Sequence, residues 1–421
     1  MTRFWHPFAD MRVVHQELVL ARGEGTWIWD DQGRRYLDGT AGLWYCNVGY
    51  GRRELAEAAA FQLQQLAAYS AYGDLATRPV LDLAERVSLL SPAPDGVVFF
   101  TSGGSDAIDS AAKLVRRYWD AVGEPQRQLI VVREGAYHGV NGFGTSLAGI
   151  GANSAGYGDL VPGVVRLPRD DALAFERLAA ERGGEIAGFF GEPVLGAGGV
   201  YPPVAGYWDK VQQVCKACEA LLVVDEVITG FGRLGRWFGS ERYHIEPDLL
   251  VCAKGITSGY IPLGAVVCGA RVAEPFWRGD AGMFRHGYTY SGHATACAVA
   301  LANIDILERE QLVESVGERE AQLEARLRSL AAHPLVEQVR TVGLLAGVEL
   351  AAEAIAHDPT LADRVVAAAR DEGLLVRHLL GKAIQISPAF VISEHEIDLL
   401  AAALEAALDR SVAEISTALA S

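Results

Sequence analysis

The middle of the chain alternates between short, wholly apolar runs and longer stretches with helical spacing. The apolar runs are four to six residues long and suit strands that are buried on both faces of a sheet. Between the first two runs, residues 105–118 repeat apolar side chains at the helical period. This alternation predicts an α/β fold with helices on both faces of a parallel sheet. The expected strands are Val97–Thr101, Leu129–Arg133, Ile186–Gly191, Leu221–Asp225, Leu249–Ala253 and Ala265–Cys268.

The two ends of the chain are expected to form a second, smaller α/β unit. Beyond about His293 the pattern is mostly helical, and Ser393 and Glu396 have the spacing of a capping box at the start of a last helix. We therefore expect residues 1–50 and 301–421 to form a small domain and residues 51–300 to form the large one. The other expected elements are helices over 294–308 and 312–332 and strands over 26–30, 36–38, 347–350 and 374–377.

Composition and charge exclude several classes of protein. Half of the 421 residues are hydrophobic and 21% are charged, which excludes a mainly disordered chain. The net charge of −16 argues against nucleic acid as the main partner, because phosphate neutralisation needs a basic surface. The six cysteines are too sparse for a disulfide framework, so we expect reduced thiols and a cytoplasmic protein. Neither a signal peptide nor an apolar run of about 18 residues is visible, so no membrane segment is expected.

A turn rich in glycine and serine follows the first expected strand. Residues 101–107 read Thr-Ser-Gly-Gly-Ser-Asp-Ala and lead into the helix expected from Ser105. Free backbone N–H groups at a helix start favour a bound anion, and Ser102 and Ser105 add hydroxyl groups. The turn therefore predicts a phosphate site, although an ordinary strand-to-helix turn can have the same composition.

Two charged residues stand at the ends of later strands. Asp225 closes the run 221–225, and Lys254 directly follows the run 249–253. Open α/β sheets bind ligands outside the carboxyl ends of their strands. A desolvated lysine there has a lowered pKa and becomes a usable amine nucleophile. Each residue also has an ordinary explanation, since acidic residues often end strands and a lysine stem can pack while its amine reaches water.

Taken together, the turn, the carboxylate and the amine predict one crevice with a specific ligand. A phosphate, a basic ring nitrogen and an aldehyde are the three groups by which pyridoxal 5′-phosphate is recognised, and proteins hold it as a lysine Schiff base with an Asp at the ring nitrogen. We therefore predict this cofactor, with Lys254 and Asp225 as the catalytic residues. The histidines are scattered without metal-ligand spacing, so no metal is predicted.

The order of the motifs resembles that of a known enzyme family. The run LVVDEVITGFGR, followed by PDLLVCAKGITSGYIPLGA, resembles the class III pyridoxal-phosphate-dependent aminotransferases. The runs RFWHPFADM, YLDGTAGLWYCNVGYGR, EGAYHG, GEPVLGAGGV and HGYTYSGHA resemble the β-alanine–pyruvate and amine–pyruvate branch, the ω-transaminases. The resemblance covers nearly the whole chain. It implies fold type I with a mostly parallel seven-stranded central sheet, and ping-pong transfer of an amino group from an ω-amino acid or amine to pyruvate or a similar oxo acid.

The resemblance also implies a role for each matched residue. Lys254 would carry the cofactor and Asp225 would pair with its protonated ring nitrogen. The other implied cofactor contacts are Gly104 and Ser105 at the phosphate, Tyr137 and Val227 on the two ring faces, Glu192 near the site, and Thr289 at the phosphate of the partner subunit's cofactor. The Thr289 role implies a homodimer with shared active sites, with a tetramer left open.

For the substrate, the resemblance implies an aromatic pocket and one arginine. Trp44 would line the pocket, with Phe4 or Trp5 nearby. Arg377 would grip a substrate carboxylate, for which the guanidinium fork is suited by its paired hydrogen bonds. The substrates would thus be a small amine donor and an oxo acid.

Two positions depart from the family pattern, and three other functions stay open. Gly103 stands where relatives carry a hydroxyl residue, which removes one expected phosphate contact, and Ala294 replaces a common proline. A relative with this fold can instead be an aminomutase or a decarboxylase. The run Gly230–Gly235 matches G-x-G-x-x-G and would suit a nucleotide-binding oxidoreductase, but no apolar helix follows it, so a loop is expected. A non-enzymatic binding protein is disfavoured by a buried lysine with an acidic partner.

Overall fold

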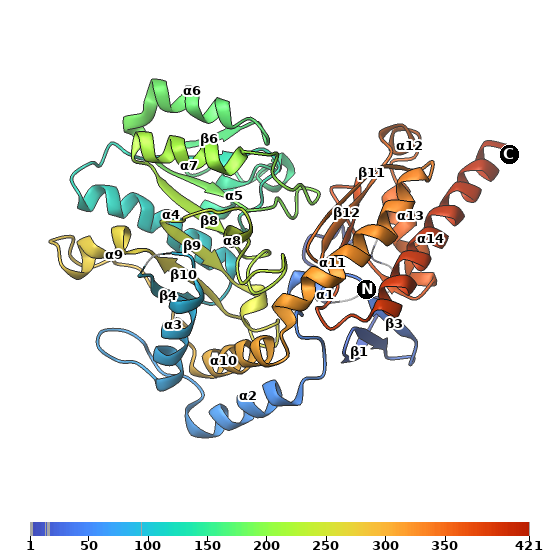
Figure 1. The fold of residues 1–421 in the computed structure, drawn as a ribbon, viewed down its shortest axis with the longest axis horizontal. Coiled ribbons are helices and arrows are strands. Elements are labelled where there is room, and N and C mark those ends of the chain that lie inside the picture. Colours follow the sequence, from blue (N-terminus) through green and yellow to red (C-terminus); the bar gives the residue numbers. More distant parts are fainter. Residues whose placement is uncertain (1–2, 13, 15–16, 94, 421) are drawn as a thin grey trace.

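A seven-stranded sheet forms the centre of the larger part of the molecule (Figure 1). The computed structural model describes residues 3–12, 14, 17–93 and 95–420, with side chains to residue 413. All neighbouring strands pair in parallel except at β10, which is antiparallel to both of its neighbours. The strand order is β4 (Val97–Thr101), β10 (Gly264–Cys268), β9 (Leu249–Cys252), β8 (Leu221–Asp225), β7 (Ile186–Gly191), β5 (Leu129–Arg133) and β6 (Val164–Leu167).

Helices cover both faces of this sheet because its strands are apolar on both sides. In β8, Leu221 and Val223 pack into the core beside α4 (Gly104–Ala121), whereas Leu222 and Val224 pack beside α7 (Tyr207–Cys218). This is the alternation expected of a doubly covered sheet. The remaining helices of this part are α2 (Arg53–Leu66), α3 (Arg78–Leu90), α5 (Gly142–Leu147), α6 (Ala172–Arg182), α8 (Gly239–Arg242), α9 (Ala270–Trp277) and α10 (Ala294–Arg309).

The six strands predicted from the apolar runs are all present, four of them with the predicted bounds. The seventh strand, β6, was not predicted. It is a four-residue edge strand with the sequence Val-Val-Arg-Leu, and its arginine interrupts the apolar pattern. The α/β architecture is confirmed, and so is the sheet of seven mostly parallel strands.

Two four-stranded sheets form the smaller part of the molecule. One has the order β1 (Leu20–Glu24), β2 (Trp27–Asp30), β3 (Arg35–Asp38), β13 (Leu374–Leu375), and the other β11 (Val336–Val342), β12 (Leu345–Leu350), β15 (Ala383–Ile386), β14 (Arg377–Leu379). Strand β3 pairs in parallel with β13, so the two chain ends share one sheet, as Figure 1 shows by its blue and red segments. This pairing agrees with the proposal that both chain ends (residues 1–50 and 301–421) form the small domain and residues 51–300 the large one, but the proposed 300/301 boundary falls inside α10 (Ala294–Arg309) of the large part. The helices here are α1 (Ala41–Trp44), α11 (Leu312–Arg328), α12 (Ala352–His357), α13 (Leu361–Asp371) and α14 (Glu394–Ala420).

Some boundaries in this part differ from the prediction. The strand expected over 374–377 is broken at Val376, because the chain leaves the sheet of β3 and enters the sheet of β15. The helix expected over 312–332 ends at Arg328 and continues as a 3₁₀ turn. The predicted capping box is present, since the Ser393 N–H donates to Glu396 Oε2 at 2.8 Å and the Glu396 N–H donates to Ser393 Oγ at 3.3 Å.

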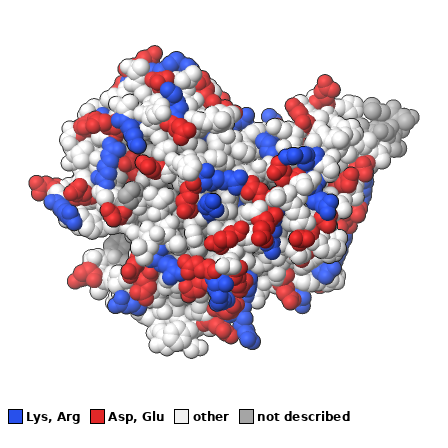
Figure 2. All heavy atoms as spheres, viewed as in Figure 1, with Lys and Arg blue, Asp and Glu red and all other residues white. Residues whose placement is uncertain are grey.

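The surface carries charges of both signs. Figure 2 shows basic and acidic side chains interspersed over the visible face, so the acidic excess of the chain is not gathered in one patch there. Within the residues that the structure describes, no helix is both long enough and apolar enough to span a bilayer.

Candidate active site

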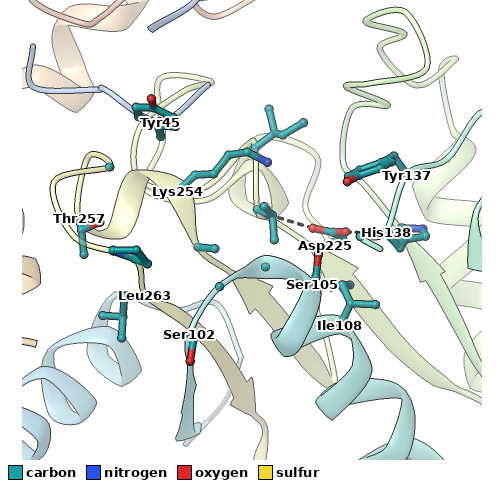
Figure 3. Close-up of a pocket in the computed structure, with 18 of the residues that line it drawn as sticks. Tyr45, Ser102, Ser105, Ile108, Tyr137, His138, Asp225, Lys254, Thr257 and Leu263 are labelled. Atoms are coloured by element: carbon teal, nitrogen blue, oxygen red, sulfur yellow. Dashed lines mark hydrogen bonds and ion pairs between the residues drawn. The ribbon is translucent and has the colours of Figure 1, made fainter. Parts of the chain in front are cut away.

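A cavity of about 360 Å³ opens at the carboxyl ends of β4, β8 and β9 (Figure 3). Seven residues that were predicted as catalytic or cofactor contacts line it together. They come from five separate segments of the chain, and Figure 3 shows several of them around one space. The seven are Gly104, Ser105, Tyr137, Glu192, Asp225, Val227 and Lys254.

The start of α4 forms one end of the cavity. No side chain caps this helix start, so its first N–H groups are free to bind a ligand anion. A Cβ on Gly104 would lie only 3.0 Å from Val227 Cγ1, so a residue with a side chain would crowd the cavity wall. Ser105 Oγ accepts the Val140 N–H at 3.2 Å, which leaves the Ser105 hydroxyl proton available to a ligand. This end of the cavity suits a phosphate.

Asp225 also lines the cavity and is held by two donors. Its Oδ1 accepts the Val227 N–H at 3.0 Å, and its Oδ2 is 2.8 Å from His138 Nδ1. Because a carboxylate is an acceptor only, Nδ1 of His138 carries the proton of that bond. Both side chains are buried. The carboxylate is therefore fixed in orientation while its remaining lone pairs face the cavity.

His138 is a site residue that sequence reasoning missed. Its neighbour Tyr137 was selected, but nothing in the local pattern joins His138 to a carboxylate 87 positions away. The signal was the Tyr-His-Gly run itself, since a buried histidine requires a polar partner.

Lys254 begins a short 3₁₀ turn after β9 and has a left-handed backbone, with φ of +44°. Desolvation lowers the pKa of its amine to about 8, against the opposing attraction of Asp225 and Glu192. No ion pair within the described part of the chain includes this amine. A desolvated amine with a lowered pKa is the kind that can act as a nucleophile, and the reactive role of Lys254 stays a prediction.

Glu192 follows β7 and adds a second carboxylate to the cavity wall. Its Oε1 accepts the Tyr137 N–H at 3.1 Å, and its Oε2 accepts the Gly196 N–H at 2.9 Å. Burial raises the pKa of this carboxyl group. The bond to Glu192 also positions Tyr137, whose ring lines the cavity.

Trp44 and Arg377 lie together beside the cavity and do not form its wall. The Trp44 ring centroid is 5.6 Å from Lys254 Nζ and 4.8 Å from the guanidinium carbon of Arg377. Burial lowers the pKa of Arg377, and the contact with Trp44 is the one ring or polar contact of its side chain among described residues. The indole is buried and its backbone is left-handed, with φ of +61°.

Three predicted residues lie away from this cavity. Phe4 and Trp5 are 61% and 81% exposed. From the same segment, Phe8 packs edge-on against Tyr137, with ring centroids 6.5 Å apart. Thr289 is exposed and outside the cavity of its own chain, where a residue that serves another subunit would lie. Its role stays a prediction.

Tyr45 is a second residue of the cavity wall that sequence reasoning missed. Its ring fills the space that Cβ atoms would need on Gly42 and Gly259, at 2.4 and 2.2 Å. Both glycines have positive φ angles, so a side chain at either position would be strained as well as crowded. The two glycines therefore hold the Tyr45 ring in place.

The run Gly230–Gly235 forms a loop, as expected, and not a nucleotide site. Arg233 at its centre is fully buried and donates to the carbonyl oxygens of Leu344 and Pro388 and to Asn47 Oδ1. The glycines permit the tight path of this loop, since Gly232 has a φ of +104° and packs against Phe390. The run ties distant segments together.

Comparison with known proteins decides the family. The model of the class-III aminotransferases matches residues 8–408. The chain belongs to this family. It is a pyridoxal-phosphate-dependent aminotransferase with fold type I, which confirms the predicted enzyme class, fold and cofactor. Residues 230–235 do not make it a nucleotide-dependent oxidoreductase.

Its relatives match over almost their full length. The putrescine–pyruvate aminotransferase of Pseudomonas aeruginosa is 38% identical, with 97% of this chain and 94% of that protein covered. The (S)-enantioselective ω-transaminase of Thermomicrobium roseum is 40% identical, with a TM-score of 0.92 and 96% of each chain covered. The ω-transaminase of Pseudomonas jessenii, solved with PMP, is 33% identical, with a TM-score of 0.93 and 98% and 97% covered.

The cavity fits the family's cofactor by the chemistry of its donors. An uncapped helix start, a fixed carboxylate and an amine that forms no ion pair with a described residue all line this cavity. These are the complements of a phosphate, a protonated ring nitrogen and an aldehyde.

Proposed function

We propose that this aminotransferase moves an amino group from an ω-amino acid or amine donor to pyruvate or a similar oxo acid. The observation that carries the proposal is Arg377, a half-buried guanidinium that no carboxylate of a described residue neutralises. A buried cation of this kind favours an anionic ligand, and an oxo acid supplies a carboxylate. One relative, named for putrescine and pyruvate, supports the choice.

We assign the cofactor contacts by the chemistry of each cavity residue. Gly104 and Ser105 would bind the phosphate, and Tyr137 and Val227 would pack on the two ring faces. Glu192 would contribute a second carboxylate beside the ring. When bound, pyridoxal 5′-phosphate supplies an aldehyde that joins an amine and a ring that accepts electrons.

Lys254 is assigned the proton transfers. A pKa of about 8 leaves part of its amine neutral at physiological pH, so Nζ can accept a proton from the carbon of the donor and later return it. Val227 and His138 hold Asp225 so that its charge faces the ring nitrogen position. Lys254 and Asp225 are thus assigned different tasks. Lys254 moves a proton, and Asp225 keeps the ring nitrogen protonated.

One pocket must accept a donor without a carboxylate and an acceptor with one. Trp44, beside the cavity, would offer an apolar surface to a donor that extends past the cavity wall, and Arg377 lies against the ring of Trp44. An arginine stem is long and flexible, so we propose that the guanidinium turns toward the oxo-acid carboxylate and away from an apolar group. Amine and acceptor would then use the same space in turn.

The Arg377→Ala variant tests this assignment together with the overall reaction. The wild-type enzyme should form alanine from pyruvate with at least one donor from a panel of β-alanine, putrescine, taurine and an arylalkyl amine. The variant should lose about 10- to 100-fold in kcat/KM for pyruvate, the worth of about 1.5–3 kcal/mol from hydrogen bonds to a charged group. With the arylalkyl amine as donor, the half-reaction rate should stay within about twofold.

The Arg377→Lys variant is the matched control, because it keeps the charge and loses the paired geometry. It should retain part of the pyruvate activity. Equal losses for pyruvate and the arylalkyl amine in Arg377→Ala would contradict the role of Arg377. Failure of every donor to form alanine with the wild type would contradict the proposed acceptor.

We also propose a homodimer, with a tetramer as a further possibility. Thr289 lies on the surface, and an apolar group of exposed side chains lies on or near its loop, where a Cβ on Gly287 would meet the Tyr72 hydroxyl at 3.1 Å. The exposed fractions are 64% for Phe61, 60% for Tyr69, 56% for Tyr72 and 63% for Tyr290. Such a group favours contact with another protein surface. Light scattering should give twice or four times the chain mass, and a monomer with full cofactor content would contradict this.

A cytoplasmic location is proposed on the state of the cysteines. All six are free thiols, and five of them are buried. Reduced thiols suit a reducing compartment. Recovery of the native protein in a periplasmic or extracellular fraction would argue against this location.

A further inference from the structure

The loop that follows Glu192 is closed on itself by backbone hydrogen bonds. Leu195 and Tyr201 pair as an antiparallel bridge, with N···O distances of 3.1 and 2.9 Å. Within the loop, the N–H groups of Gly199 and Val200 both donate to the Gly196 carbonyl, at 3.1 and 3.0 Å. The Gly196 N–H in turn donates to the Glu192 carboxylate. The position of that carboxylate therefore depends on the shape of this loop.

Arg340 on β11 binds the outer side of the same loop. Its Nε donates to the Val200 carbonyl at 2.8 Å, and its Nη2 donates to the Gly199 carbonyl at 2.7 Å. Nη1 donates to Gln338 and forms an ion pair with Glu349. All three guanidinium nitrogens therefore donate hydrogen bonds, and the side chain is 7% exposed. These bonds cross from the small part of the molecule to the large one.

The loop needs this support because its backbone is strained. Val200 has a φ of +56°, a left-handed conformation that a β-branched residue adopts only when its surroundings impose it. The Val200 side chain is fully buried in a cluster that also contains Trp44 and Ile228. Ile228 lines the cofactor cavity, so the strained residue lies directly behind the site.

The aromatic ring of Tyr201 reinforces the same contact. The guanidinium carbons of Arg169 and Arg340 lie 3.7 and 4.0 Å from its centroid. Its hydroxyl is 3.2 Å from both carboxylate oxygens of Glu349, which is the ion-pair partner of Arg340. Arg340 therefore packs against the ring at the end of the loop and also donates to the carbonyl oxygens within the loop.

We propose that Arg340 is a positioning residue for the cofactor site, acting through the loop 193–200 on the Glu192 carboxylate. The inference rests on the proposed role of Glu192 beside the cofactor. It assigns a function to a residue that lies outside the cavity and touches neither cofactor nor substrate. It also means that a shift of β11 relative to the central sheet changes the charge distribution around Lys254.

The physical link runs through single hydrogen bonds that no other described group replaces. Removing Arg340 leaves two carbonyl groups of buried residues, Gly199 and Val200, without these donors, which is costly. The loop then relaxes toward an unstrained backbone, and the Gly196 N–H moves away from Glu192. Lys254 faces the carboxylates of Asp225 and Glu192 and the guanidinium of Arg377. A displaced Glu192 therefore removes negative charge near the Lys254 amine.

The test uses the cofactor-loaded protein and two readouts besides activity. The first is the pH midpoint of the absorption change of bound pyridoxal 5′-phosphate, and the second is its dissociation constant, from quenching of tryptophan fluorescence. Arg340→Met should shift the midpoint downward by about 0.4 to 1 unit and weaken binding about 3- to 30-fold. Arg340→Lys keeps a charge for Glu349 but reaches only one carbonyl, so its effects should be intermediate.

Arg242→Met is the matched control. Arg242 on α8 also joins a carboxylate, Glu320, to a backbone carbonyl, that of Leu234, and it contacts no residue of the loop 193–200. It should lower the melting temperature without moving the absorption midpoint. A midpoint that moves equally in Arg242→Met and Arg340→Met would show a general effect of loosened packing and would overturn the proposal.

The double variant Glu192→Gln/Arg340→Met decides whether Arg340 acts through Glu192. Its midpoint should equal that of Glu192→Gln alone, because the charge that Arg340 positions is already gone. Additive shifts would overturn the proposed route. If the wild type failed to bind the cofactor, the proposed function would fail. An unchanged midpoint in both Arg340 variants would refute this inference alone.

Discussion

Replacing Lys254 with alanine is expected to remove transaminase activity by at least about 10⁴-fold, the upper range for loss of a general acid–base group. In the proposed role its amine both holds the cofactor and transfers the proton, and no other lysine of the described residues lines the cavity. Stopped-flow measurement of the donor half-reaction checks the loss. Borohydride treatment followed by peptide mapping should label the wild type on the peptide that contains Lys254.

Lys216→Ala is the control, since Lys216 lies on the surface in an ion pair with Glu246. It should keep full activity and full labelling. The rate at which cofactor-free protein captures pyridoxal 5′-phosphate should rise with pH up to about 8 and then level off, because the neutral amine reacts and its pKa is lowered to about 8. A rate still rising at pH 10, or label on another lysine, would contradict the assignment to Lys254.

The elements that carry this chemistry could be predicted because each is locally encoded. Strands β8 and β9 are apolar on both faces, and a charged residue stands at the end of β8 (Asp225) or two residues beyond the end of β9 (Lys254), a pattern that places both at one sheet edge. The pattern does not reveal that β10 separates β9 from β4, or that it runs antiparallel. The sequence therefore placed the phosphate turn at the correct edge of the sheet, but it could not predict how far the turn lies from Lys254.

Contacts between distant segments could not be predicted in this way. The bond between His138 and Asp225 needs the ends of two strands that are not adjacent in sequence. The bonds from Arg340 to Gly199 and Val200 join residues about 140 positions apart. The local sequence pattern cannot reveal such pairs, because each partner fits the pattern of its own strand or loop whether or not the distant contact forms.

The expected place of Phe4 or Trp5 near the substrate shows another limit. Their motif was matched as a run, which carries no information on which aromatic ring of the run meets the site. In the structure Phe8 contacts Tyr137. Strand β6 was missed for a related reason, since an edge strand is half solvated and its arginine breaks the apolar run.

Asp225→Asn is expected to lower kcat by about 10²- to 10³-fold, the usual cost of losing one preorganised electrostatic contact in an active site. The substitution keeps the shape of the side chain and can keep the Val227 N–H bond, but it removes the negative charge. A neutral amide no longer favours a protonated ring nitrogen, so the ring accepts electrons less readily. Single-turnover kinetics at saturating cofactor measure the loss without interference from weaker cofactor binding. A loss below about threefold would contradict the role of Asp225.

His138→Phe separates orientation from charge in the same site. Phenylalanine fills the buried space beside Phe190 but cannot donate to Asp225 Oδ2. The carboxylate then keeps one of its two fixed donors. The kcat should fall about tenfold relative to the wild type, because a single bond to a charged group is worth about 1.5 kcal/mol or more. This loss is smaller than the one expected for Asp225→Asn. In the double variant the two losses should not add, since His138 acts only through the charge that Asp225→Asn removes. Full additivity would mean that His138 has a separate contact with the reacting groups.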